Sequence, residues 1–209
     1  MSYHWTVEQV ERFTRLARKV ERAARKKDGS RFNPVLFLRK MEEAFLHTIP
    51  EPAGGRICVL SNVLVHEDED WTQALEAAGP QTPLHDRIRR GSSLYPPSGR
   101  GDVYKDFLLL NWPGRPLSKF LDWGKANGLA GTIARDVFAV GREEPHLNRD
   151  IVMDPMWVYA TELRTLTGFV DPCMVLVQWN KEERETNYRG AESFGFARDW
   201  CLFSRETNY

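Results

Sequence analysis

The order of the predicted elements is the feature that most constrains the fold of this chain. Apolar residues recur at helical spacing over residues 7–24 and 34–49, so two helices are predicted to open the chain. Strand-like runs, rich in β-branched and apolar residues, occupy residues 56–65, 103–112, 173–179 and 193–203. Because the helices come first and do not alternate regularly with the strands, the pattern favours an α+β fold. We expect N-terminal helices packed on a mixed or antiparallel sheet, with the last two strands paired as a C-terminal hairpin.

Four shorter helices are predicted between the strands. Asp70 is a suitable N-cap for the first of them, and Asp154 followed by Pro155 is a suitable start for the last. Residues 91–101 contain two prolines and three glycines, which is typical of an exposed loop. The four helices are predicted over residues 71–78, 116–127, 132–140 and 154–168.

The length and composition fit one domain. A chain of 209 residues that is 42% hydrophobic and 28% charged can bury a core of ordinary size. We therefore predict a single α+β domain over residues 1–209, with a helical, basic part at 1–50 and a mixed part at 51–209. The longest apolar runs, such as 107–110, are too short to span a bilayer, and no secretory signal opens the chain. This pattern predicts a soluble, cytoplasmic protein with no membrane partner.

The cysteines and histidines do not have the spacing of a metal site. No two cysteines form a C-x-x-C pair, and the five histidines are scattered along the chain. We expect no metal and no cofactor. Each cysteine lies between apolar neighbours, which predicts buried, reduced thiols. The three cysteines are Cys58, Cys173 and Cys201.

The formal net charge of zero hides an uneven distribution. Residues 1–40 hold eleven Lys and Arg against four acids. Several of these cations recur at steps of three or four on the first predicted helix, so one helix face is basic while the opposite face is apolar. Such a face can neutralise the phosphates of nucleic acid or contact an acidic protein, although it is also typical of a solvated helix surface. The predicted contact residues are Arg12, Arg15, Arg18, Arg22 and Lys26.

The two helices around Gly128 have an approximate helix-turn-helix spacing. A tight glycine turn of this kind lets a recognition helix project into the major groove, where Arg135 is the candidate contact. Polar Asn127 stands where the motif prefers an apolar residue, and Asp136 would oppose a phosphate. An ordinary corner between two helices has the same appearance.

A third pattern suggests nucleotidyl or phosphoryl transfer. Gly91 and Ser92 precede Asp102 and Asp106, which resembles a nucleotidyltransferase site with a Gly-Ser turn and carboxylates that hold magnesium. The resemblance is incomplete, because the second carboxylate should follow two residues after Asp102 and that position is Tyr104. Magnesium is expected only under this alternative, with Ser92, Asp102 and Asp106 as the weak catalytic candidates.

Two other groups of residues have both a structural and a functional interpretation. The run from His66 to Asp70 places a possible base beside four acids, but such a run more often precedes a helix whose dipole favours negative charge. Seven tryptophans could stack on bases, yet their apolar neighbours favour core packing for most of them.

One pentapeptide occurs twice. Residues 184–188 and 205–209 both read Arg-Glu-Thr-Asn-Tyr. The repeat is either a duplicated surface epitope or a coincidence in a polar loop and a chain end.

These patterns favour a non-catalytic intracellular binding protein that contacts nucleic acid or an acidic protein partner through its basic N-terminal helix. The alternative is a transfer enzyme with a degenerate site at 91–106. A further alternative is a protein inhibitor that acts by surface contact. The sequence leaves the enzyme question open and favours a non-enzyme.

Overall fold

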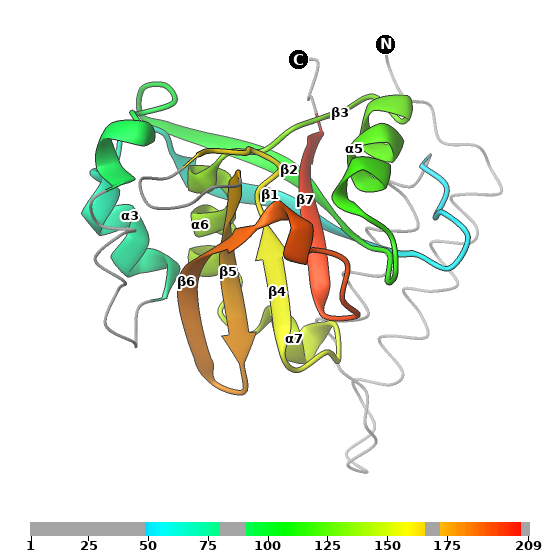
Figure 1. The fold of residues 1–209 in the computed structure, drawn as a ribbon. Helices are drawn as coiled ribbons and strands as arrows, with labels where there is room; N and C mark the ends of the chain where they lie inside the picture. The colour runs from blue at the N-terminus through cyan, green and yellow to red at the C-terminus, as the bar shows by residue number, and fades with distance from the viewer. Residues whose placement is uncertain (1–48, 80–90, 166–171, 206–209) are drawn as a thin grey trace, which may run out of the picture. The chain divides into compact units, whose positions relative to one another are not determined.

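A computed structural model describes residues 49–79, 91–165 and 172–205 of the chain (Figure 1). All of them belong to the compact unit Ile49–Tyr209. The predicted helices over residues 1–50 lie outside the described residues, and so does the basic face of the first helix. The prediction of one domain over the whole chain therefore stays a prediction.

The described part contains one mixed sheet of seven strands. Its strand order is β1-β2-β7-β4-β5-β6, and β3 pairs with β7 beside this path. Every pairing is antiparallel except that of β4 with β7. The strands are β1 (Arg56–His66), β2 (Asp102–Asn111), β3 (Leu129–Ala130), β4 (Met156–Tyr159), β5 (Cys173–Asn180), β6 (Glu183–Gly190) and β7 (Asp199–Arg205).

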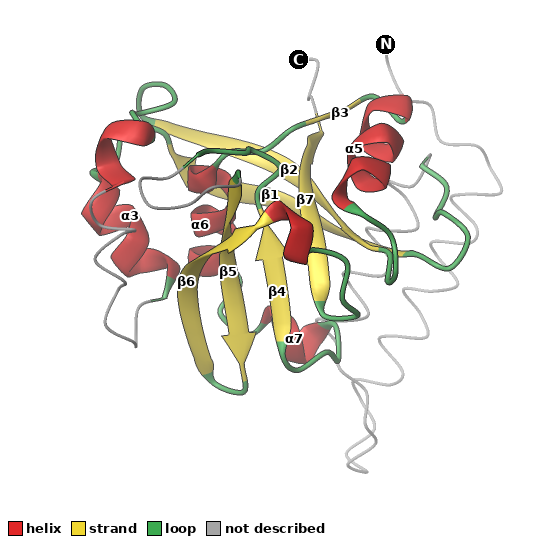
Figure 2. Ribbon diagram, viewed as in Figure 1, coloured by secondary structure: helices red, strands yellow, loops and turns green. Residues whose placement is uncertain are grey.

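Within the described residues, four helices and two short 3-10 turns lie between these strands (Figure 2). Asp70 caps the first helix as predicted, since its side chain accepts hydrogen bonds from the backbone amides of Thr72 and Gln73 at 2.8 and 3.3 Å. The two helices on either side of Gly128 are also confirmed to within a few residues. The elements are α3 (Trp71–Ala78), α5 (Leu117–Ala126), α6 (Ala134–Glu143), α7 (Leu147–Asp150), η1 (Gly91–Leu94) and η2 (Ala191–Ser193).

Both faces of the sheet bury apolar side chains. On the first face, Trp71 of α3 and Phe138 of α6 pack over β1, β2, β5 and β7. On the second face, Phe120 of α5 packs with Phe194 and with residues of β2, β4, β5 and β7. Alternate residues of β2 enter the two clusters, which explains why residues 107–110 form an unbroken apolar run. The mixed sheet with helices on both faces is consistent with the predicted α+β class.

Two predictions about the second half of the chain are wrong. Residues 154–168 do not form one helix, because Met156–Tyr159 is strand β4, buried between β5 and β7. The aromatic and β-branched residues of β4 suit a sheet, and this preference outweighs the Asp-Pro helix-start signal. The hairpin partner of β5 is also different: it is β6 at 183–190, whereas β7 pairs with β2, β3 and β4. Strand β6 is polar because it lies at the edge of the sheet, where charged residues are tolerated.

The structure also places the repeated pentapeptide and the three cysteines. The first copy of the repeated pentapeptide, 184–188, lies inside β6, while only Arg205 of the second copy lies within the described residues. All three cysteines are buried and free of disulfides, as predicted. Within the described ranges, no helix is both long and apolar enough to cross a membrane.

Gly141 tests the close packing of α6 against α3. A Cβ atom at this position would lie 2.7 Å from the carbonyl oxygen of Ala78 and 3.2 Å from Cγ1 of Val177. Alanine favours a helix over glycine by about 1 kcal/mol, but the contact with a backbone atom forces the two helices apart. We expect Gly141→Ala to lower the free energy of unfolding by about 1–3 kcal/mol in urea titrations.

The exposed Ser118→Ala substitution in α5 serves as the control for helix propensity alone, and it should change stability by less than about 0.5 kcal/mol. A Gly141→Ala protein that is more stable than the wild type would contradict the packing described for this contact.

Candidate functional site

Two arginines and two aromatic rings gather beside the second face of the sheet. We call this group the arginine-aromatic patch; it consists of Trp157, Arg189, Phe196 and Arg198. The Cζ atom of Arg198 lies 3.8 Å from the centroid of the Trp157 ring, and that of Arg189 lies 4.5 Å from it. The same two atoms lie 5.8 and 5.3 Å from the Phe196 ring, which is 53% exposed. Each guanidinium is therefore within cation-π distance of both rings.

Local structure explains how the patch forms. Trp157 comes from β4 and Arg189 from β6, while Phe196 and Arg198 belong to the turn that leads into β7. Gly195 begins this turn with a φ of 117°, and a Cβ there would lie 2.6 Å from the carbonyl oxygen of Arg115. Glycine is therefore required for the turn to pass this close to residue 115.

The carboxylate of Asp199 fixes the same turn from inside. It is 1% exposed and accepts hydrogen bonds from the backbone amides of Gly195 and Phe196 at 3.0 and 2.9 Å. The hydroxyl of Tyr159 lies 3.3 Å from its other oxygen. Burial raises the pKa of Asp199, while the two amides act against this rise. This carboxylate is therefore held by the turn. Arg189 also acts to lower its pKa, but no ion pair joins Asp199 to either patch arginine among the described residues.

The patch arginines have unused hydrogen-bonding capacity. Among the ion pairs of the described residues, none involves Arg189 or Arg198. Nη1 of Arg189 and Nε of Arg198 are buried and lack a hydrogen-bond partner. These two nitrogens are closed off from solvent, so an anionic ligand would bind the other N–H groups of the two guanidiniums, both of which belong to half-buried residues.

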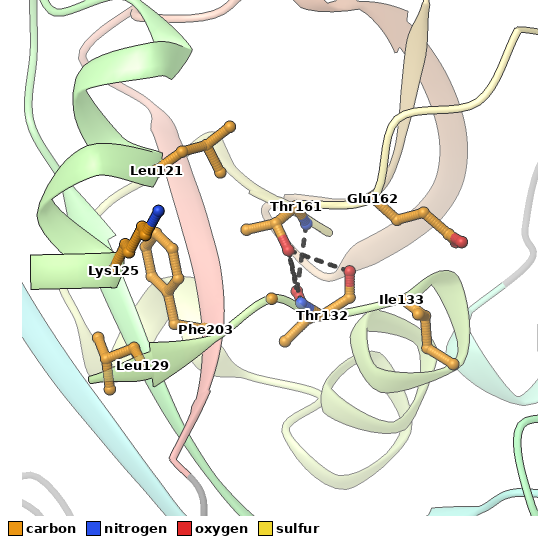
Figure 3. Close-up of a pocket in the computed structure, with 9 residues that line it drawn as sticks. Leu121, Lys125, Leu129, Thr132, Ile133, Thr161, Glu162 and Phe203 are labelled. Atoms are coloured by element: carbon orange, nitrogen blue, oxygen red, sulfur yellow. Dashed lines mark hydrogen bonds between the residues drawn. The ribbon is translucent and has the colours of Figure 1, made fainter. Parts of the chain in front are cut away.

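A second candidate site lies where the sheet divides. Strand β7 pairs with β4 through residues 199–201 and with β3 through residues 204–205, and the two partners diverge between these positions. We call the hollow at this point the fork pocket (Figure 3). It has a volume of about 440 Å³ and is lined by Leu121, Lys125, Leu129, Gly131, Thr132, Ile133, Thr161, Glu162 and Phe203.

Two buried threonines replace the missing ladder bonds at the fork. The hydroxyl of Thr132 donates to the carbonyl oxygen of Leu202 at 2.7 Å and accepts the amide of Thr161 at 3.2 Å. The hydroxyl of Thr161 accepts a hydrogen bond from the backbone amide of Thr132 at 2.5 Å. It donates one to the carbonyl oxygen of Thr132 at 3.1 Å. We call this arrangement the threonine pair. It satisfies buried backbone groups that no strand reaches.

The two predicted catalytic carboxylates, Asp102 and Asp106, do not come together. Asp102 contacts Nδ1 of His66 at 2.5 Å, whereas Asp106 accepts the backbone amide of Asn62 at 2.8 Å, at a bulge in β1. Both lie on β2 four residues apart, which separates them by about 13 Å along the strand. The described residues contain no cluster of three or more metal-binding side chains. The side chain of Ser92 lies outside what the structure describes.

Arg135 is buried, so the helix-turn-helix interpretation gains no support. It is 4% exposed, and its guanidinium donates to the carbonyl oxygens of Glu69 and Tyr95 at 2.5 and 3.4 Å. Residues 134–141 of α6 are all buried, so this helix has no open face for a DNA groove. The role of Arg135 in nucleic-acid binding stays a prediction without structural support. The other predicted contact residues, Arg12, Arg15, Arg18, Arg22 and Lys26, lie outside the described ranges.

The acidic run at 66–70 precedes helix α3, in line with the structural interpretation, and two of its acids also form ion pairs that the sequence did not predict. Lys105 contacts Glu67 at 2.9 Å and the buried Asp136 at 3.1 Å, and Arg142 contacts Glu69 at 2.5 Å. Burial raises the pKa of Asp136, and Lys105 opposes the rise. Desolvation acts to lower the pKa of Lys105, but the Asp136 and Glu67 carboxylates outweigh it and raise the net value.

Comparisons with known proteins add no family to this description. Neither a family model, nor a curated protein, nor a solved structure matches the chain.

The arginine-aromatic patch was not predicted from the sequence, because residue 157 was predicted to lie in a helix. The one available signal was the aromatic and basic character of residues 194–200 beside the polar run 183–190.

Removal of Lys105 tests the buried ion pair. In Lys105→Met, the pKa of Asp136 rises further because its counter-charge is gone. A carboxyl group whose pKa is higher in the folded than in the unfolded state stabilises the folded protein at pH values below its unfolded-state pKa. This stabilisation is lost as the pH rises through its folded-state pKa. We therefore expect a stability deficit of about 3 kcal/mol near neutral pH that shrinks toward about pH 4.

Lys119→Met is the matched control, because Lys119 pairs with Asp122 at 3.9 Å on the exposed surface of α5. Its effect should stay below about 0.5 kcal/mol at every pH. Chemical denaturation across this pH range measures both variants, and equal, pH-independent losses would contradict the assignment.

Proposed function

We propose that this protein is a non-catalytic binding protein for single-stranded nucleic acid, and that the arginine-aromatic patch contacts the strand. The observation that carries the proposal is the pair of guanidinium groups, Arg189 and Arg198, that lack ion pairs among the described residues and flank two aromatic rings. Such groups bind phosphates through directed hydrogen bonds and stack on bases through their planar faces.

The geometry favours single strands over duplexes. Bases stack on protein side chains only where they are unpaired, and the exposed ring of Phe196 offers a platform for one of them. Arg115 extends the surface, because its backbone adjoins the turn at Gly195 and its own guanidinium lies 5.6 Å from the ring of Trp112. Alternating cations and rings of this kind can follow a strand over several nucleotides.

The basic sequence at residues 1–40 supports the same class of partner, since it would add non-specific attraction for phosphates. The transfer-enzyme alternative loses its main support, because Asp102 and Asp106 have separate partners. An acidic protein surface could satisfy the same cations and also pack on the exposed ring of Phe196, so direct binding measurements must separate the two partners.

Fluorescence anisotropy with a labelled oligonucleotide of about 15 nucleotides tests the proposal. We expect binding by the full chain at low salt, weaker binding to the duplex of the same sequence, and a steep loss with salt. Arg189→Glu and Arg198→Glu should each weaken binding about tenfold or more and lower the salt slope by about 0.7. Phe196→Ala should cost about 1–3 kcal/mol by loss of stacking.

The matched control is Arg100→Glu, which makes the same charge change at an exposed loop residue and should have little effect. A separate triple variant, Arg15→Glu, Arg22→Glu and Lys26→Glu, measures the contribution of the N-terminal sequence. No binding by the wild type at low salt would overturn the proposal, as would equal losses for Arg100→Glu and the patch variants. Equal affinity for polyglutamate would favour the acidic-protein alternative instead.

A further inference from the structure

The fork pocket is separate from the arginine-aromatic patch and plays no part in the proposed function. None of its nine lining residues belongs to the patch. Its walls come from five segments: α5, β3, the connection from β3 to α6, the chain after β4, and β7. A volume of about 440 Å³ is in the range of pockets that hold small molecules.

The walls of the fork pocket are largely apolar. Leu121 of α5, Leu129 of β3, Ile133 and Phe203 of β7 line it. The two hydroxyl groups on its floor already donate to the carbonyl oxygens of Leu202 and Thr132. Because these protons are committed, the body of a ligand would meet mainly hydrocarbon.

The fork pocket has one charged side chain with an ion-pair partner and one without a partner among the described residues. Figure 3 shows Lys125 and Glu162 on opposite sides of the hollow, with Thr132 and Thr161 between them. The carboxylate of Glu162 is paired with Arg164, whose Nε lies 2.9 Å from it. Lys125 is exposed, and no ion pair of its ammonium occurs among the described residues. The pocket therefore presents one uncompensated positive charge beside apolar walls.

We infer that the fork pocket binds a small amphipathic monocarboxylate, with its apolar body against Leu121, Leu129 and Phe203 and its carboxylate at Lys125. Charge complementarity selects the acid over the neutral compound of the same length. Burial of the apolar body supplies most of the affinity, because each buried methylene contributes about 0.8 kcal/mol. The Lys125 contact lies at the exposed rim and contributes less than the walls do.

Isothermal titration of the full chain with decanoate, and with decanol as the neutral analogue, tests this inference. We expect saturable decanoate binding and at least about threefold weaker binding of decanol. Lys125→Gln should reduce decanoate affinity about threefold and Lys125→Glu about tenfold, with little change for decanol.

Lys119→Glu is the matched control, since it makes the same charge change on the same helix at a residue that does not line the pocket. Arg189→Glu should leave decanoate binding unchanged, which separates this site from the nucleic-acid proposal. Absence of decanoate binding up to millimolar concentration would overturn the inference. Equal affinity of wild type and Lys125→Glu, or of decanoate and decanol, would do the same.

Discussion

The pairing of β7 is the constraint on which the rest of the described structure depends. This strand pairs with β2 along one edge, and its other edge is shared between β4, which runs parallel to it, and the two-residue β3. Between β3 and β4, the carbonyl group of Leu202 faces no strand. The hydroxyl of Thr132 fills this position at 2.7 Å, and Thr161 completes the exchange of hydrogen bonds. The sheet can therefore divide without leaving these buried backbone groups unpaired.

The division of the sheet positions both candidate sites. It opens the fork pocket between α5 and the connection from β3 to α6, and Gly131 is needed there because a Cβ would lie 2.9 Å from Oγ1 of Thr161. At the other end of β7, the turn before the strand is fixed by Asp199 and carries Phe196 and Arg198 to the ring of Trp157. Strand β7 thus has the fork pocket at one end and the arginine-aromatic patch at the other.

Local signals in the sequence predicted the elements whose chemistry matches their environment. The sequence pattern is clear for three of them. Strands β1 and β2 each contain a run of consecutive buried apolar residues, and helix α3 begins at the Asp70 cap. Strand β6 was missed because an edge strand can be polar on one face, and β4 was missed because four residues are too few to show a period. Neither the fork pocket nor the arginine-aromatic patch could be predicted, since both join residues from distant segments whose pairing is set by tertiary contacts.

The central claim is that the threonine pair holds the sheet together at its fork, and a double-mutant cycle of Thr132→Val and Thr161→Val tests it most directly. Urea unfolding should show a loss of about 1–3 kcal/mol for each single variant and a coupling energy of about 1 kcal/mol or more. Thr72→Val, at an exposed residue of α3, controls for the change of side chain. Additive effects no larger than that of Thr72→Val would contradict the account.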